Sequence, residues 1–101
     1  MSAGITRSGT DSHSGHASPT PSPFHKTSYT GGSDNVFVNG DNAIRGENTD
    51  STTCGDPAVG GSSTVFVNGK KVHRDGDSTG GHGSWVANSS AGGSSDVFAG
   101  D

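Results

Sequence analysis

Apolar residues are sparse along this chain and recur in one short pattern. A Val-Phe pair follows a Gly-Gly-Ser phrase in three ten-residue segments, 31–40, 60–69 and 92–101. Repetition at a spacing of about 30 residues indicates that one structural unit is repeated. Valine and phenylalanine favour strands, and the flanking Gly, Ser and Asn residues favour turns. The pattern predicts no helix. It predicts strands over residues 35–39, 64–68 and 96–99.

Two of these strands lead into a tight turn. Asn39-Gly40 and Asn68-Gly69 are strong type I′ turn signals, because both central positions of that turn need a positive φ. The residues after each turn would form a second strand, or arm, that ends at an arginine, over 41–45 and 70–74. Residues 4–7 have the same character but lack a strand before them. Variable loops follow the arms and span residues 8–29, 46–59 and 75–91.

The composition allows only a thin hydrophobic core. Hydrophobic residues make up 25% of the 101 residues, leucine is absent, and Leu, Ile, Val and Phe together number 14. A disordered Gly/Ser-rich linker is one interpretation, but a formal charge of −4 is low for disorder, and a linker needs no matched Val-Phe pairs. So small a core needs a metal, disulfides or a partner. Cys54 is the only cysteine, which excludes an internal disulfide, whereas five histidines favour a metal.

Several functional classes are disfavoured by the same data. Six basic against ten acidic residues do not favour nucleic-acid binding. The N-terminus is polar and no apolar run exceeds three residues, so we expect neither a signal peptide nor a membrane span. The chain has no His-Glu-x-x-His spacing and no recognisable nucleophile–base set, so we expect no enzymatic activity and no small-molecule substrate. The length predicts one domain over residues 1–101. Because we expect no signal peptide, we also expect the protein to be made in the cytoplasm.

The repeated phrases resemble the PAAR-repeat family. The resemblance lies in the GGSxxVFVNG phrases at 31–40 and 60–69 and in the truncated copy at 92–101. The arginine-ending tetrapeptides 42–45 and 71–74 stand in the place of Pro-Ala-Ala-Arg. The resemblance implies an all-β fold, a small cone of three pseudo-threefold β-hairpin repeats with a metal-bound apex and no significant helix. The three units would span residues 4–40, 41–69 and 70–101.

The resemblance also implies a function. PAAR-repeat proteins form the sharpened tip on the trimeric β-helical spike of contractile injection machines, such as phage tails and type VI secretion systems. We therefore expect a structural, membrane-piercing tip on the central spike of a phage tail baseplate, one chain per trimer. It would be part of the virion and contact the target-cell membrane transiently. The alternatives are a stand-alone type VI tip that recruits an effector and a free metal-binding surface module. The chain ends at Asp101, directly after the third strand, which favours a plain phage-type tip.

Spacing within the repeats selects ligands for the implied metal. Cys54 and His25 each lie 11 residues before the first valine of a repeat, while His16 and Cys54 each lie nine residues after an arm arginine. His82 lies eight residues after the third arm arginine. Cys and His donors suit zinc or another transition metal, one per chain. The alternative is that these histidines are ordinary surface residues and Cys54 a small buried one. The predicted ligands are His16, His25, Cys54 and His82, with His13 as the substitute and His73 excluded.

The predicted strands also offer a docking face. Valines point to one side of each strand and Phe37, Phe66 and Phe98 point to the other. One set must fill the core, and we expect the larger phenylalanines to do so. The partner-binding residues would then be Val36, Val38, Val65, Val67 and Val97.

Overall fold

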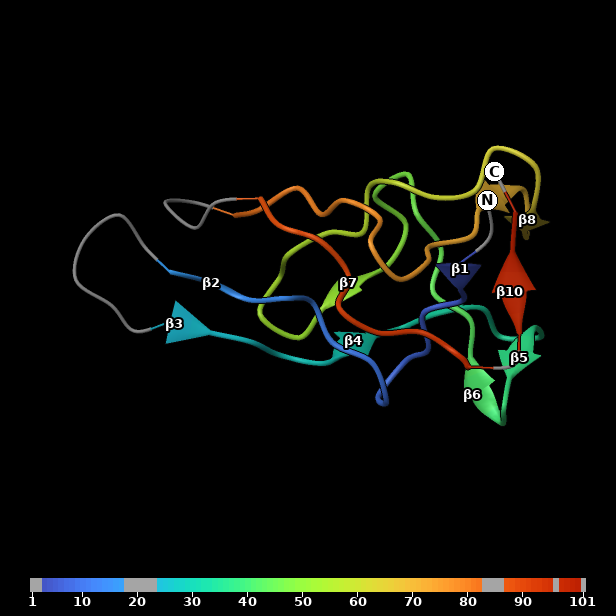
Figure 1. Cartoon of the computed structure of the whole chain (residues 1–101), viewed down its shortest axis with the longest axis horizontal. Helices are drawn as coiled ribbons and strands as arrows, with labels where there is room; N and C mark the ends of the chain where they lie inside the picture. The colour runs from blue at the N-terminus through green and yellow to red at the C-terminus, as the bar shows by residue number, and fades with distance from the viewer. Residues whose placement is uncertain (1–2, 18–23, 83–86, 96, 101) are drawn as a thin grey trace.

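The computed structural model describes residues 3–17, 24–82, 87–95 and 97–100. These residues form short strands, turns and isolated bridges without any helix, which confirms the predicted all-β class. The body measures 38 × 23 × 21 Å, with three hairpins at one end and the β2–β3 pair toward the other (Figure 1). The strands are β1 (Ala3–Gly4), β2 (His16–Ala17), β3 (Phe24–His25), β4 (Tyr29–Thr30), β5 (Phe37–Val38), β6 (Asp41–Asn42), β7 (Ser51–Thr52), β8 (Phe66–Val67), β9 (Lys70–Lys71) and β10 (Phe98–Ala99).

Two hairpins are built as the sequence predicts. β5 pairs with β6 and β8 with β9, and both pairs are antiparallel with two-residue turns. Asn39 and Gly40 have φ values of 54° and 87°, and Asn68 and Gly69 have 54° and 81°. Positive φ at both central positions is the requirement of a type I′ turn, so the predicted turn chemistry is confirmed.

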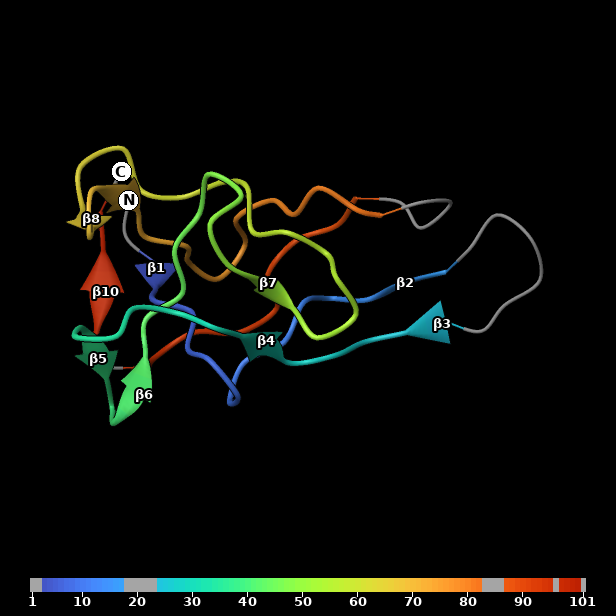
Figure 2. The same ribbon diagram turned by 180° about the vertical axis from the view of Figure 1, so that it is seen from behind.

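The third unit is completed by strands from the two ends of the chain, and we count this strand pair as the third hairpin. β10 pairs with β1, with Ala99 opposite Ala3 and Phe98 opposite Gly4. The arm at residues 4–7 therefore has its strand after all, at the C-terminal end of the sequence. The view from behind shows β1 and β10 beside β5, β6 and β8 at the same end of the molecule (Figure 2). We call this end the base.

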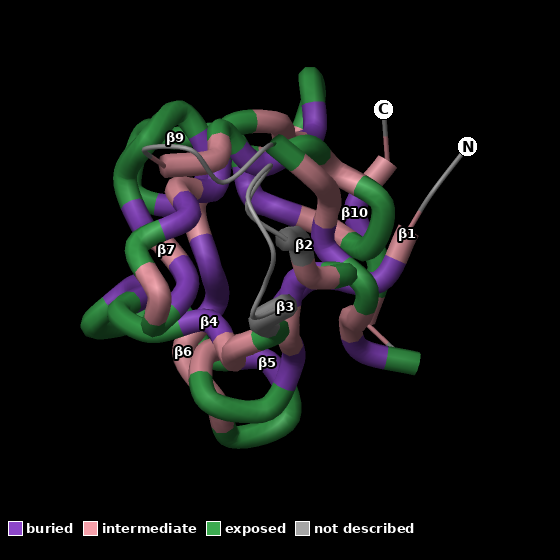
Figure 3. The backbone as a smooth tube through the Cα atoms, turned by 90° about the vertical axis from the view of Figure 1, so that its left-hand side faces the viewer, coloured by how far each residue is buried: buried purple, intermediate pink, exposed green. Residues whose placement is uncertain are grey.

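A closed ring of backbone hydrogen bonds connects the three arms. The N–H of Thr6 donates to the carbonyl of His73 at 3.0 Å, that of His73 to Ile44 at 2.9 Å, and that of Ile44 to Thr6 at 3.1 Å. Antiparallel bridges flank the ring at each corner. Seen along the long axis, β5–β6, β9 and β10–β1 lie on three sides of the molecule (Figure 3). One chain thus imitates threefold symmetry.

The Gly-Gly-Ser phrases allow each hairpin to lie directly against its arm. A Cβ on Gly61 would lie 2.7 Å from the carbonyl oxygen of Val72, closer than real side chains approach, and one on Gly32 would make a tight contact of 3.0 Å with that of Ala43. The serine that follows accepts a backbone N–H from the valine three residues later, as Ser62 does from Val65 at 3.0 Å. The phrase is therefore a device for close backbone approach and a turn, which explains its repetition.

Each arm ends in an arginine that is anchored to an aspartate. In all three units the arginine Nε lies 2.8 Å from an aspartate Oδ2, and the arginine backbone N–H donates to the same oxygen. The pairs are Arg7–Asp11, Arg45–Asp50 and Arg74–Asp77. Burial acts to raise the pKa of Asp50, but the hydrogen bonds from Arg45 and the backbone outweigh it and lower that pKa.

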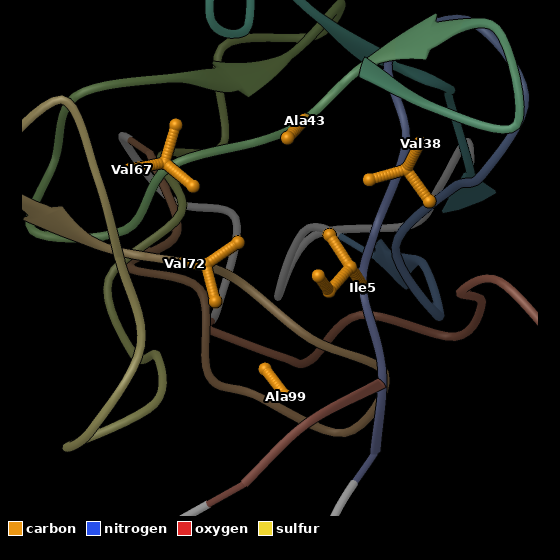
Figure 4. Packing of buried hydrophobic residues seen from close by; sticks show 6 residues of the cluster. All are labelled: Ile5, Val38, Ala43, Val67, Val72 and Ala99. Carbon is orange, nitrogen blue, oxygen red and sulfur yellow. The ribbon is translucent and has the colours of Figure 1, made fainter. Parts of the chain in front are cut away.

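The core is filled by small aliphatic residues, and the phenylalanines lie outside. Six side chains from the three hairpins converge on one point, namely Ile5, Val38, Ala43, Val67, Val72 and Ala99 (Figure 4). Phe37, Phe66 and Phe98 are 58%, 53% and 56% exposed. The expectation that phenylalanines fill the interior is therefore wrong. The three hairpins approach the axis so closely, through the glycines, that only small side chains fit between them.

This arrangement also removes most of the valines from the expected docking face. Val38 and Val67 are buried in the core, and Val65 and Val97 are partly buried against it. Val36, at 36%, is the most exposed valine of the five. The base therefore presents phenylalanine where valine was expected.

Beneath the ring, a polar pair fills the centre. Tyr29 and His73 are fully buried, and the Tyr29 hydroxyl lies 2.8 Å from His73 Nε2. His73 Nδ1 donates to the Gly60 carbonyl at 2.7 Å, so Nε2 accepts the hydroxyl proton of Tyr29 and the imidazole is neutral. Burial lowers the pKa of His73 from 6.5 and raises that of Tyr29, because both charged forms lose their hydration.

Because the valines face inward and the phenylalanines outward, substitutions at neighbouring positions should have unequal effects on stability. Val67→Ala removes two buried methyl groups and should lower the free energy of unfolding by about 2 kcal/mol. Phe66→Ala changes a side chain that is 53% exposed and should lower it by only about 1 kcal/mol. Urea denaturation of both variants measures the difference, and a larger loss for Phe66→Ala would contradict the observed core.

The neutral His73 predicts a loss of stability in acid. The unfolded chain gains a proton as the pH falls through 6.5, whereas the folded chain resists protonation until a lower pH. The unfolded state then binds more protons, so the free energy of unfolding decreases below pH 6.5. The variant His73→Gln should lose this part of the pH dependence, while Asp56, Arg74 and Asp77 near the ring remain as in the parent. Thermal denaturation at several pH values measures both slopes, and equal slopes would refute the assignment.

Candidate functional site

Two residues predicted to be metal ligands, His16 and His25, occupy opposite backbone positions of one strand pair at the end opposite the base. β2 and β3 pair in antiparallel fashion, with His16 opposite His25 and Ala17 opposite Phe24. The pair lies far from the three hairpins along the long axis (Figure 1). We call this end the tip. The backbone register thus brings together two ligand candidates from the first loop.

Cys54 lies in a turn beside the segment that leads away from His25. Its backbone N–H donates to Thr27 Oγ1 at 3.2 Å, and the N–H of Thr53 donates to the Ser28 carbonyl at 2.9 Å. The thiol is half-buried, with Sγ 3.2 Å from Thr52 Oγ1 and 3.7 Å from His13 Nε2. The second loop is therefore joined to the first loop at the level of Cys54.

His82 enters the same region from the third loop. It is half-buried and follows Gly81, whose backbone N–H donates to Asp56 Oδ1 at 2.6 Å. Asp56 stands two residues after Cys54, and the N–H of Gly80 donates to the carbonyl of Pro57 at 3.0 Å. The chain segments that carry all four predicted ligands therefore converge in one part of the molecule.

His13, the predicted substitute, has a different environment. Its ring is fully buried, Nε2 accepts the N–H of Thr27 at 3.0 Å, and Nδ1 lies 2.9 Å from Asn88 Oδ1 and 3.2 Å from Asp56 Oδ2. Because Nε2 is an acceptor, Nδ1 bears the proton and donates it to Asn88. A metal on Nε2 would deprive the Thr27 N–H of this acceptor. These contacts fit a structural role for His13.

The donor chemistry of the tip fits a metal, although the side chains do not define a site. Over the ranges that the structure covers, no group of three His, Cys, Asp or Glu side chains could hold a metal ion. The side chains of His16 and His25 fall outside the described part. Thiolate sulfur and imidazole nitrogen, the donors of the predicted set, are both ligands that zinc binds in proteins. His73, excluded from the set, has both ring nitrogens engaged by Tyr29 and Gly60.

The base carries the second candidate site, a triangle of aromatic side chains. Phe37, Phe66 and Phe98 occupy equivalent positions on β5, β8 and β10, each more than half exposed. Their cross-strand neighbours are Asn42, Lys71 and Gly4. Sequence reasoning assigned these residues to the core. The one signal against that assignment is the alanine at position 99, where the other repeats have valine, which indicates a cramped interior on that side.

Comparison with known proteins identifies a family. A family model described as the PAAR motif matches residues 21–88, which is more than half of the chain. No curated protein and no solved structure matches the chain. Within the described residues no helix is long and apolar enough to cross a membrane, and no pocket is found.

Proposed function

Because this chain belongs to the PAAR motif family of spike-tip proteins of contractile injection systems, we propose that it caps the trimeric β-helical central spike of a contractile phage tail. The observation that carries the proposal is the triangle of exposed phenylalanines at the base, Phe37, Phe66 and Phe98. These residues stand on hairpins that the backbone ring relates by a pseudo-threefold axis. The role is structural, and the partner is the blunt end of the spike.

Symmetry argues for one chain per spike trimer. A single polypeptide can meet a threefold axis with equal contacts only if its own surface repeats three times. The three phenylalanines have nearly equal exposure and equivalent strand registers, and each can meet the same surface of one spike subunit. A second chain on the same axis would find that surface covered.

Burial of the three phenylalanines would contribute part of the free energy of docking. Complete burial of an exposed phenylalanine contributes about 1.5–3 kcal/mol, so burying the exposed half of each gives roughly 1 kcal/mol or slightly more. Three such residues together contribute roughly 3–4 kcal/mol, to which backbone and polar contacts of the base would add. The base thus offers a docking face that the thin core does not need for itself.

The first and last strands of the described body lie at the base. Ala3 and Ala99 are cross-strand partners at the base, so the chain enters and leaves the described body there. We propose that the protein is made in the host cytoplasm, is assembled into the virion and contacts the target membrane transiently when it pierces it.

We further propose that the tip binds one zinc ion or similar transition metal per chain, through His16, His25, Cys54 and His82. The support is the convergence of their backbone segments from three loops together with the Cys-His₃ donor chemistry. The ion would supply a rigid crosslink where the Gly/Ser-rich loops have little to pack against.

Charged substitutions on the phenylalanine triangle test docking. The double variant Phe37→Asp with Phe66→Asp should bind the purified spike trimer at least about 100-fold more weakly, since two anchors are lost and two charges are desolvated. It should remain folded, because both positions are exposed. The matched control is Val59→Asp, which alters a 37% exposed residue outside the hairpins. Gel filtration with mass determination measures binding and stoichiometry.

Two results of this experiment are informative beyond the loss itself. Full binding by the double variant would place the docking face elsewhere. A type VI spike would present the same kind of threefold end. The parent protein should therefore be offered both a phage spike and a type VI spike. Preferential binding to the phage spike supports the phage proposal, and preferential binding to the type VI spike supports a stand-alone secretion tip.

Removal of the metal should loosen the tip and leave the base ordered. Metal analysis of the purified protein should find one equivalent, which Cys54→Ser should reduce. After chelation, hydrogen exchange should accelerate at the amides of Thr27 and Gly81, whereas the ring amides of Thr6, Ile44 and His73 should keep their protection. A folded protein without metal, or unchanged exchange at the tip, would refute the proposal.

A further inference from the structure

We infer that three residues, His13, Asp56 and Asn88, form a buried polar platform that positions the ligand-bearing segments of the tip. His13 and Asp56 are fully buried and Asn88 is half-buried. Asn88 Oδ1 accepts the His13 Nδ1 proton at 2.9 Å, and Asn88 Nδ2 donates to Asp56 Oδ2 at 2.6 Å. The three side chains come from three different loops. The inference rests on the metal site proposed above.

Each member of the platform contacts the chain beside a predicted ligand. Asn88 Oδ1 accepts the backbone N–H of Gly15, the residue before His16, at 3.0 Å. Asp56 Oδ1 accepts that of Gly81, the residue before His82, at 2.6 Å. Both contacts fix the backbone one residue away from a ligand candidate.

His13 completes the set on the remaining two segments. Its Nε2 accepts the N–H of Thr27, two residues after His25, at 3.0 Å. The same nitrogen lies 3.7 Å from Cys54 Sγ. One connected group of three side chains therefore reaches all four segments.

The chemistry of the platform is hard to explain by stability alone. Burying a carboxyl group and an imidazole costs free energy that hydrogen bonds only offset, and an apolar filling of the same space is often as stable or more so. A polar filling, in contrast, fixes the relative positions of the chain segments, because each hydrogen bond specifies where one segment lies. Groups behind metal ligands act in this way and commonly change metal affinity 10- to 100-fold.

The threefold repeat that orders the base does not extend to the loops of the tip. The ring and the arginine anchors repeat three times at the base, but the loops beyond them differ in length and sequence. At the position of His13, two residues after the anchoring aspartate, the other two units carry Thr52 and Thr79. Threefold repetition therefore cannot set the relative positions of the ligand segments, and the platform does so. Its members are positioning residues that do not contact the ion.

A comparison of two buried hydrogen-bond deletions tests the inference. Asn88→Ala removes the centre of the platform, and Tyr29→Phe removes the bond from the Tyr29 hydroxyl to His73, which lies outside it. Zinc affinity is measured by competition with a chromophoric chelator. We expect Asn88→Ala to bind zinc at least tenfold more weakly with unchanged stoichiometry, and Tyr29→Phe to bind within about twofold of the parent.

A spectroscopic readout separates positioning from general destabilisation. With cobalt in place of zinc, saturated Asn88→Ala should show altered ligand-field absorption, whereas Tyr29→Phe should match the parent. If Asn88→Ala does not fold, Asn88→Asp replaces it, because it has the same size and loses the donation to Asp56 and Thr79. Weaker zinc binding is again expected, since two carboxyl groups then adjoin.

The outcomes are distinct. Parent-like affinity and cobalt spectrum in the folded Asn88 variant would overturn the platform while leaving the metal site in place. Equal weakening by Asn88→Ala and Tyr29→Phe would also overturn it, because the effect would then be one of stability. Failure of the parent protein to bind zinc or cobalt would overturn the proposed metal site and the platform with it.

Discussion

The closed ring of backbone hydrogen bonds among Thr6, Ile44 and His73 is the constraint on which the rest of the structure depends. Each residue donates to one neighbour and accepts from the other, so the ring closes only when all three arms are present. A missing arm would leave a buried N–H and a buried carbonyl without partners, at about 1–3 kcal/mol each. This requirement explains why the two ends of the chain meet in one hairpin and why glycines line the approaches to the arms.

With so few apolar residues, the body is stabilised largely by satisfied polar groups. The arginine–aspartate anchors hold the ends of the arms, the serines of the repeated phrases close the turns, and Tyr29 with His73 fills the centre. Six small aliphatic side chains supply the apolar contribution on the axis. Burying few large side chains leaves the three phenylalanines available on the base, where a partner can use them.

The two ends of the molecule differ in symmetry. The base is repetitive, which suits a surface that meets three equal copies of a partner subunit. The tip is built from three unlike loops joined by His13, Asp56 and Asn88, which suits a single site that holds one ion. A body with a repetitive base and a tip joined by buried hydrogen bonds suits the spike cap proposed above.

The sequence by itself determined what depends on local chemistry: the strands after each Gly-Gly-Ser phrase, the Asn-Gly turns, the arginine-ending arms and the absence of helix. It also selected loop residues whose backbone segments do converge at the tip. Only the tertiary structure decided that β10 supplies the strand for the first arm, that valine and alanine face inward, and that His13 is buried with Nε2 accepting the N–H of Thr27. Alternation along a strand defines two faces without saying which is inside. That choice depends on how closely the other two hairpins approach the axis, and such distances between remote segments are not encoded in any single stretch of the chain.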